Sequence, residues 1–182
     1  MGFVMLEIEV VKTLSNNYLL CREGTCLVFD CGGAKVASRV EELGLKPLAV
    51  FITHLHFDHV AGLRSFTKRF KEVRVYSPRT SLADLLDINT AIGRLLTRGV
   101  LQVGIEGGES FELGPFEVEV IKVGRHTRHH VCYLVYGEAL VTGDVAAIRG
   151  GRVIIMSKKV ETLLREREVK AVLPGHSKYL VR

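Results

Sequence analysis

Residues 48–59 read LAVFITHLHFDH and set three histidines and an aspartate directly after an apolar run. The run is short and rich in β-branched and aromatic residues, which predicts a buried strand that ends at the first histidine. Side chains two apart in an extended segment share a side, so His54 and His56 face one point, while Asp58 and His59 turn towards a second. Imidazole and carboxylate groups are ligands of zinc, iron and manganese. A solvated polar loop is the alternative, but the whole chain holds only seven histidines, so this stretch is the candidate active site.

Length, composition and charge indicate an ordinary globular protein. The 182 residues, 47% hydrophobic and 25% charged, predict a single domain over residues 1–182 with a sizeable core. No apolar run is long enough to cross a bilayer, and Glu7 and Glu9 are unlike a signal peptide, so we expect a cytoplasmic protein without membrane contact. The net charge of +5 comes from scattered basic residues without any tryptophan, so a nucleic-acid partner is not favoured and a small-molecule partner is expected. The oligomeric state is left open.

The polar residues and cysteines give two further hints. One glutamine and three asparagines among many charged residues are typical of a thermophilic source. The four cysteines form no CxxC pair, which excludes a zinc ribbon and a thioredoxin motif. Cys21 and Cys26 flank a four-residue turn, and two states are open to them: a disulfide, which a thermophile tolerates inside the cell, or buried free thiols.

The apolar pattern predicts strands and helices without a linker between them. Strands are expected at residues 6–12, 18–21, 26–29, 48–53, 74–76, 116–120, 131–136, 139–142 and 170–173. Helices are expected at residues 34–43, 60–70 and 81–97, and near the C-terminus after Ser157 as N-cap. The helix at 81–97 begins with a capping box, has a candidate break at 87–90 and carries no ligand candidate. We expect it to pack on the core or to flank a substrate pocket.

Three more ligand candidates each follow a predicted strand: His126, Asp144 and His176. Any one of them alone is typical of a turn or a cap. Together with the first loop, the order His-x-His-x-Asp-His, then His, Asp and His, resembles the metallo-β-lactamase superfamily and most of all its glyoxalase II-like hydrolase branch. The resemblance extends from Asp30 to His176.

The resemblance implies an α/β fold: a four-layer αβ/βα sandwich of two mixed β-sheets flanked by helices. It also implies two divalent metal ions, with zinc expected first and iron or manganese as alternatives. One ion would be held by His54, His56 and His126, the other by Asp58, His59 and His176, with Asp144 as the bridge. Asp30 and His130 would support these ligands through hydrogen bonds.

The chemistry of this ligand set points to hydrolysis. Seven nitrogen and oxygen ligands without cysteine are too many for one structural zinc, and they suit two ions with open positions. Ions ~3.5–4 Å apart share a water and lower its pKa towards ~7. The bridging hydroxide would be the nucleophile, Asp58 would orient it, and the ions would stabilise the developing oxyanion. We therefore expect cleavage of an ester-like bond: thioester, lactone or phosphodiester, in that order.

Two alternatives stay open. The first is an iron-dependent enzyme similar to the persulfide dioxygenases, and the second is a nucleic-acid processing nuclease of the same fold. Antibiotic hydrolysis is not favoured, because the commonest true β-lactamases carry cysteine where Asp144 stands. Only six residues follow His176, so we do not expect the helical domain with which glyoxalase II binds glutathione.

The neighbours of the ligand candidates predict an anionic substrate. Four arginines lie close to them in the sequence: Arg125, Arg128, Arg149 and Arg152. If the two loops meet at the metals, as the resemblance implies, these guanidinium groups ring the site and bind a carboxylate or phosphate. The alternative is that they point to solvent or pair with carboxylates, as on thermophile surfaces.

Overall fold

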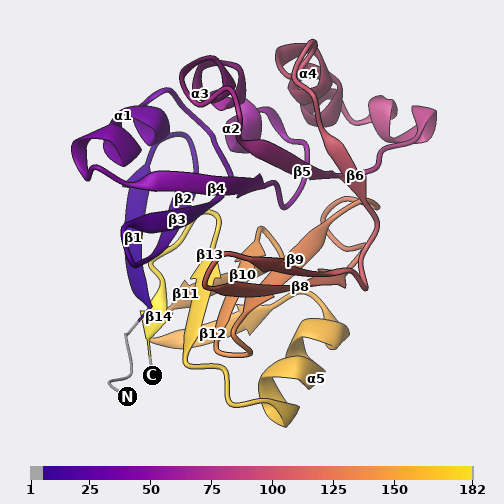
Figure 1. Cartoon of the computed structure of the whole chain (residues 1–182). Helices are drawn as coiled ribbons and strands as arrows, with labels where there is room; N and C mark the ends of the chain where they lie inside the picture. Colours follow the sequence, from indigo (N-terminus) through magenta and orange to yellow (C-terminus); the bar gives the residue numbers. More distant parts are fainter. Residues whose placement is uncertain (1–5, 182) are drawn as a thin grey trace.

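Two six-stranded sheets lie at the centre of the computed structural model, which describes residues 6–181 (Figure 1). The first has the order β1 to β6, formed by Glu7–Lys12, Asn16–Arg22, Thr25–Phe29, Lys46–Phe51, Arg74–Pro78 and Val103–Ile105. The second has the order β14-β13-β10-β9-β8-β7, formed by Leu180–Val181, Ala171–Pro174, Ala139–Gly143, Val131–Val135, Phe116–Lys122 and Ser110–Leu113. Both sheets mix parallel and antiparallel pairs. Ala146–Arg149 (β11) and Arg152–Ile155 (β12) form a separate hairpin.

Helices cover the outer faces of the two sheets (Figure 1). Those of the first sheet are α1 (Lys35–Glu42), α2 (Phe57–Val60), α3 (Leu63–Arg69), the 3₁₀ helix η1 (Leu82–Leu86) and α4 (Ile88–Leu96). The second sheet is covered by α5 (Lys158–Glu166). The expected sandwich of two mixed sheets flanked by helices is therefore confirmed.

Strand alternation explains the layers, because successive residues of a strand face opposite sides of its sheet. In β3, Leu27 and Phe29 belong to the core between the sheets, whereas Cys26 and Val28 pack with the residues of α1 and α3. All four side chains are fully buried. Strands covered on both faces need apolar residues at every position, which is why this one has no polar alternation.

Hydrogen bonds join the two sheets at the end where the candidate loops emerge. Tyr133 of β9 donates its hydroxyl hydrogen to the carbonyl oxygen of Ile52 at 2.5 Å. Tyr18 of β2 donates to the carbonyl oxygen of Pro174 at 2.6 Å. Each bond holds the backbone immediately before one of the candidate metal-binding loops, so these loops start from fixed points.

The prediction of one continuous helix over residues 60–70 is wrong, because the helical segment starts earlier and is interrupted. The structure has two helices, α2 from Phe57 and α3 from Leu63, with a break at Gly62. A Cβ atom at Gly62 would lie 2.3 Å from the carbonyl oxygen of Gly33, so this close backbone approach requires glycine. The break has a tertiary cause, which helical periodicity does not reveal.

The segment at 81–97 departs from the expected packing helix. The capping box of Ser81 and Asp84 is present, but it starts a 3₁₀ helix, and α4 begins only after Asp87. Most of its large apolar side chains are exposed, led by Leu82 at 86% and Leu86 at 90%. Small residues of α4, rather than these leucines, are buried against the rest of the protein.

The predictions for the cysteine pair, the start of the last helix and the short strands have different outcomes. Cys21 and Cys26 lie opposite each other on β2 and β3 and are buried free thiols. Ser157 precedes α5 as expected, but its side chain makes no capping hydrogen bond. Five short strands lie outside the expected strand ranges: β6, β7, β11, β12 and β14. Among the described residues no helix is long and apolar enough to span a membrane.

Candidate metal centre

The predicted ligands gather at one end of the two sheets. His54 and His56 follow β4, Asp58 and His59 lie in α2, and the remaining three follow β8, β10 and β13: His126, Asp144 and His176. The short helix α2 turns the chain directly after His56, which is its N-cap residue. After this turn Asp58 and His59 contribute to a second group, although the rings of His54 and His59 stay close, with centroids 4.2 Å apart.

The first group consists of His54, His56, His126 and Asp144, each with one ligand atom within 4.8 Å of the others. The His126 Nε2 atom lies 3.1 Å from His56 Nδ1. Asp144 Oδ2 lies 3.4 Å from His126 Nε2 and 3.8 Å from His54 Nε2. Two ligands ~2.1 Å from one ion at a tetrahedral angle are roughly 3.4 Å apart, so these spacings fit a metal ion.

The second group consists of Asp58, His59 and His176. Asp58 Oδ2 lies 3.0 Å from His176 Nε2 and 3.6 Å from His59 Nε2. Asp144 reaches this group too, with Oδ1 3.3 Å from His59 Nε2 and Oδ2 3.4 Å from His176 Nε2. Asp144 therefore lies between the groups, where a bridging carboxylate would lie.

Buried polar atoms without partners support metal binding. His54 Nε2, His59 Nε2 and Asp144 Oδ1 are buried and have no hydrogen-bond partner among residues 6–181. A buried polar atom left unpaired is costly, and native proteins rarely carry several together. These three are among eight such atoms in residues 6–181, and they are the ones that lie in the two ligand groups, where cations would satisfy them. The donor set fits two divalent ions.

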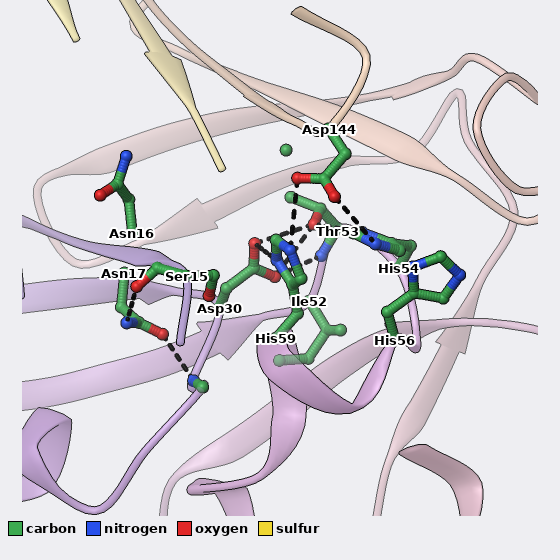
Figure 2. A network of polar contacts seen from close by, with 12 residues as sticks. Ser15, Asn16, Asn17, Asp30, Ile52, Thr53, His54, His56, His59 and Asp144 are labelled. Atoms are coloured by element: carbon green, nitrogen blue, oxygen red, sulfur yellow. Dashed lines mark hydrogen bonds and ion pairs between the residues drawn. The ribbon is translucent and has the colours of Figure 1, made fainter. Parts of the chain in front are cut away.

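Asp30 and Thr53 fix the ring orientation of two of the histidines (Figure 2). Asp30 Oδ2 accepts a hydrogen bond from His59 Nδ1 at 2.7 Å and another from the Thr53 hydroxyl at 2.8 Å. Because the hydroxyl hydrogen goes to Asp30, Thr53 Oγ1 accepts from His54 Nδ1, 3.1 Å away. Nδ1 of each ring is thereby engaged and Nε2 is turned towards the ligand groups, the usual orientation of a metal-binding histidine. Asp30 was expected in this role, whereas Thr53 was not.

His56 is held by a residue that the sequence did not point to, Asp87. Its Oδ2 lies 2.6 Å from His56 Nε2 and also accepts the Thr90 hydroxyl hydrogen at 2.7 Å. The proton of the ring is thereby kept on Nε2, and Nδ1 faces His126. In the sequence Asp87 belongs only to a candidate helix break, and in the structure it caps α4 by accepting from the backbone amide of Asn89.

His129 and His130 each contact the segment that carries the first two ligand candidates. His130 stacks on His54 with ring centroids 4.7 Å apart, and its Nε2 faces the carbonyl oxygen of Thr142 at 2.9 Å. His129 is buried. Its Nε2 accepts a hydrogen bond from the backbone amide of Leu55, between the first two ligand candidates, at 3.1 Å.

The electrostatic environment favours neutral His54 and ionised Asp144, the forms of these side chains that bind metal ions. Burial, followed by the neighbouring imidazoles, lowers the pKa of His54 well below its usual value, so the ring is neutral. Burial raises the pKa of Asp144, but His59 and the other histidines outweigh this and lower it to about 2. Burial likewise lowers the pKa of His59, while Asp30 and Asp144 outweigh it and raise the value to about 10. Asp144 is thus ionised and available to a cation.

The absence of a side chain at Gly175 leaves room for the carboxylate of Asp144. A Cβ atom on Gly175 would lie 2.1 Å from Asp144 Oδ1 and 2.9 Å from His59 Cε1. The backbone of this residue is fixed from both sides, because its amide donates to Gly143 at 2.9 Å and its carbonyl accepts from Asn16 at 2.7 Å. The motif Pro-Gly-His therefore needs glycine for a steric reason.

The four arginines expected around the site are all exposed. Within residues 6–181 none of them forms an ion pair with a carboxylate. Arg125 and Arg128 belong to the His126 loop, whereas Arg149 and Arg152 face each other across the closing turn of the β11–β12 hairpin. Their role towards a substrate stays a prediction.

Comparisons with known proteins agree with this geometry. A family model described as the metallo-beta-lactamase superfamily matches residues 11–176. The probable metallo-hydrolase YqgX of Bacillus subtilis (strain 168) is 32% identical over 174 residues, which is 90% of this chain and 82% of that protein.

Two solved structures show the same fold. ETHE1 from Myxococcus xanthus superposes with a TM-score of 0.67 at 20% identity, over 95% of this chain and 76% of that one. TTHA1623 in a di-iron-bound form has a TM-score of 0.67 at 23% identity, over 97% and 94% of the two chains. On the family match and the sequence relative, the chain belongs to the metallo-beta-lactamase superfamily and is an enzyme of that superfamily.

Proposed function

We propose that the chain is a dinuclear metal-dependent hydrolase that cleaves an ester-like bond, in a thioester, a lactone or a phosphodiester. The observation that carries the proposal is the position of Asp144, whose carboxylate oxygens lie 3.3–3.8 Å from ring nitrogens of both ligand groups. A single structural ion would not need seven nitrogen and oxygen donors divided in this way.

Each group is assigned one ion. The assigned ligands are His54, His56 and His126 for the first ion, Asp58, His59 and His176 for the second, and Asp144 for both. Two divalent ions held there would lower the pKa of a water molecule and polarise the bond that it attacks. Zinc is our first choice, and iron or manganese suits the same donors.

The protein's own groups orient the reaction. Asp58 is partly accessible, with 16% of its side chain exposed, so its carboxylate can accept a hydrogen bond from the attacking water and align it. Asp30 holds the His59 ring through a 2.7 Å contact and, through Thr53, the His54 ring. This arrangement keeps the ligand atoms in place during turnover, which favours preorganised catalysis.

The second candidate is an iron-dependent oxygenase similar to the persulfide dioxygenases. Two observations favour it: the ligand set contains no cysteine and suits iron as well as zinc, and a relative of the same fold has been crystallised in a di-iron-bound form. A nuclease of the same fold is the third candidate, which salt-dependent cleavage of RNA would support.

A substrate panel on metal-analysed protein separates these candidates. Freshly purified protein is assayed for metal content, for hydrolysis of thioesters, lactones and phosphodiesters, and for oxygen uptake with a persulfide. Hydrolysis without oxygen uptake supports the proposal. Oxygen uptake by an iron-loaded protein that hydrolyses none of the esters would overturn it in favour of the second candidate.

The substrate is proposed to be a small anionic molecule. The exposed and unpaired arginines of the His126 loop and the β11–β12 hairpin are candidates for its recognition: Arg125, Arg128, Arg149 and Arg152. A cytoplasmic location stays a prediction, which the location of the protein in the cell tests. A thermophilic source also stays a prediction, which the melting temperature of the protein tests.

A further inference from the structure

A cavity of about 310 Å³ opens beside His176, one of the proposed ligands. Its wall is formed by the loop between β1 and β2 and by the loop after β13, with polar side chains from both: Lys12, Thr13, Ser15, Asn16, Ser177 and Lys178. A volume of this size is at the lower end of the range for small-molecule sites. Because His176 is part of the wall, a molecule in the cavity also reaches the second ligand group.

The walls of the cavity are fixed to each other and to the ligand loop. Asn16 Nδ2 donates to the carbonyl oxygen of Ser177 at 2.6 Å, across the two loops. Ser15 Oγ donates to the carbonyl oxygen of the proposed ligand Asp58 at 2.8 Å. Ile148 of the β11–β12 hairpin donates its amide hydrogen to Ser177 Oγ at 2.7 Å. The cavity is therefore an ordered part of the centre rather than a gap between mobile loops.

The charge of the cavity has one sign. None of the described residues that line it is acidic, while Lys12 and Lys178 each contribute an ammonium group. In the part of the chain that the structure describes, neither lysine forms an ion pair. A cleft of one charge beside a reactive centre concentrates molecules of the opposite charge.

The hydroxyl groups of the wall are already engaged, whereas the two ammonium groups are charged donors without an ion-pair partner among the described residues. Ser15 gives its hydrogen to Asp58, and Thr13 Oγ1 contacts the carbonyl oxygen of Ser15 at 3.4 Å and accepts from Asn17 at 2.9 Å. An ammonium group is a compact charge with three rotatable donors, so it serves a carboxylate and a phosphate equally.

We propose that Lys12 and Lys178 bind the anionic group of the substrate, a carboxylate or a phosphate, while the scissile bond lies at the two ligand groups. This inference rests on the proposed hydrolase function and names the side of the centre on which the anion lies. It also differs from recognition by the arginines of the His126 loop, because the cavity adjoins the second ligand group and not the first.

The test compares a charged and a neutral substrate of the same shape. Hydrolysis of an aryl butyrate and of the aryl monoester of succinate is measured with three metal-loaded proteins. These are the wild type, the cavity variant Lys12→Gln/Lys178→Gln and the loop variant Arg125→Gln/Arg128→Gln. Lys68→Gln/Lys71→Gln removes two exposed positive charges near α3 and controls for net charge. A third substrate carrying a phosphate in place of the carboxylate shows which anion is preferred.

We expect the cavity variant to lose at least about tenfold in kcat/KM for the anionic esters, mainly through KM, while butyrate hydrolysis changes little. Lys12→Arg/Lys178→Arg should retain most of the preference, because the charge is kept. An equal loss on charged and neutral esters would overturn the inference, and so would an unchanged preference for the anion. A loss confined to the arginine variant would assign the anion to the His126 loop instead.

A binding measurement keeps this inference separate from the proposed function. Calorimetric titration of metal-loaded protein with succinate needs no turnover. Weaker binding to the cavity variant than to Lys68→Gln/Lys71→Gln supports the lysine site even if no ester is hydrolysed, in which case only the hydrolase proposal fails. Equal binding to both variants would remove the lysine site and leave the hydrolase proposal standing.

Discussion

At the scale of single residues, the centre depends on which nitrogen each histidine presents. Asp30, Thr53 and Asp87 each contact the ring nitrogen that is not turned towards the ligand groups. Such contacts fix the tautomer and the direction of the lone pair, so they raise metal affinity without touching the metal.

The first prediction concerns Asp87. Replacing it with Asn keeps a side-chain oxygen for capping α4 but removes the charge 2.6 Å from His56 Nε2. We expect metal affinity at the first group to fall about 10- to 100-fold, the usual cost of losing such a partner. Competition with a chelator of known affinity measures this. Glu72→Gln, an exposed carboxylate outside the centre, is the matched control, and equal affinities of the two variants would contradict the assigned role.

The second prediction concerns Gly175. Its substitution by Ala places a methyl group 2.1 Å from Asp144 Oδ1, and the backbone cannot retreat because it is hydrogen-bonded on both sides. We expect metal content and activity to fall together while the circular dichroism spectrum stays native. Gly104→Ala is the control, since its added carbon meets only the flexible side chain of Arg79. Full metal occupancy in Gly175→Ala would show that Asp144 has more freedom than the structure indicates.

At the scale of elements, η1 and α4 brace the His-x-His loop from outside. Asp84 of η1 lies 3.6 Å from His129 Nδ1, and His129 in turn accepts from the Leu55 amide. Asp87 contacts His56, and Gly93 of α4 packs on the carbonyl oxygen of Leu55. The segment therefore works through its polar and small residues, while its leucines stay exposed.

The third prediction concerns Gly93. A Cβ atom there would lie 1.9 Å from the Leu55 carbonyl oxygen and 3.3 Å from Val60 Cγ2, so Gly93→Ala must push α4 away from the loop. Overpacking of this kind typically costs about 1–3 kcal/mol of stability. Urea unfolding of the metal-free protein measures the cost, and chelator competition should show weaker binding at His56. Helix propensity alone would stabilise the variant by about 0.8–1.0 kcal/mol, because Ala is a better helix former than Gly, so a measured stabilisation would contradict the packing role of Gly93.

The sequence predicts those parts of the centre that are local in the chain. The motif at 54–59 is recognisable from its own spacing, whereas the residues that follow β8, β10 and β13 become a set of ligand candidates through the resemblance to the superfamily. Asp87 and His129 are different, because their partners lie 31 and 74 residues away in the sequence. The break at Gly62 has the same origin, since it depends on contact with Gly33.

At the scale of the whole molecule, the centre joins the two sheets. The segment after β4 carries proposed ligands from the first sheet, and the loops after β8, β10 and β13 carry proposed ligands from the second. The direct hydrogen bonds between the sheets at this end include Tyr133 to Ile52 and the Val131 amide to the Thr53 carbonyl. Metal ions would add further links between the same two halves.

The fourth prediction follows from this position. A metal that binds the folded chain and not the unfolded one stabilises it by about 2.7 kcal/mol at a free concentration one hundred times the dissociation constant. We therefore expect the melting temperature to fall on treatment with a chelator and to recover when zinc is restored. Asp144→Ala should show a smaller metal-dependent shift, and an equal shift in the variant would place the stabilising ion elsewhere.

The most direct test of the central claim is the number of metal ions bound per chain, measured by plasma mass spectrometry on wild type and Asp144→Ala. With seven ligands in two groups joined by Asp144, the wild type should hold close to two ions per chain. Asp144→Ala should lose metal and hydrolytic activity together. One ion per wild-type chain, or a fully loaded and fully active Asp144→Ala protein, would contradict a two-metal centre bridged by this carboxylate.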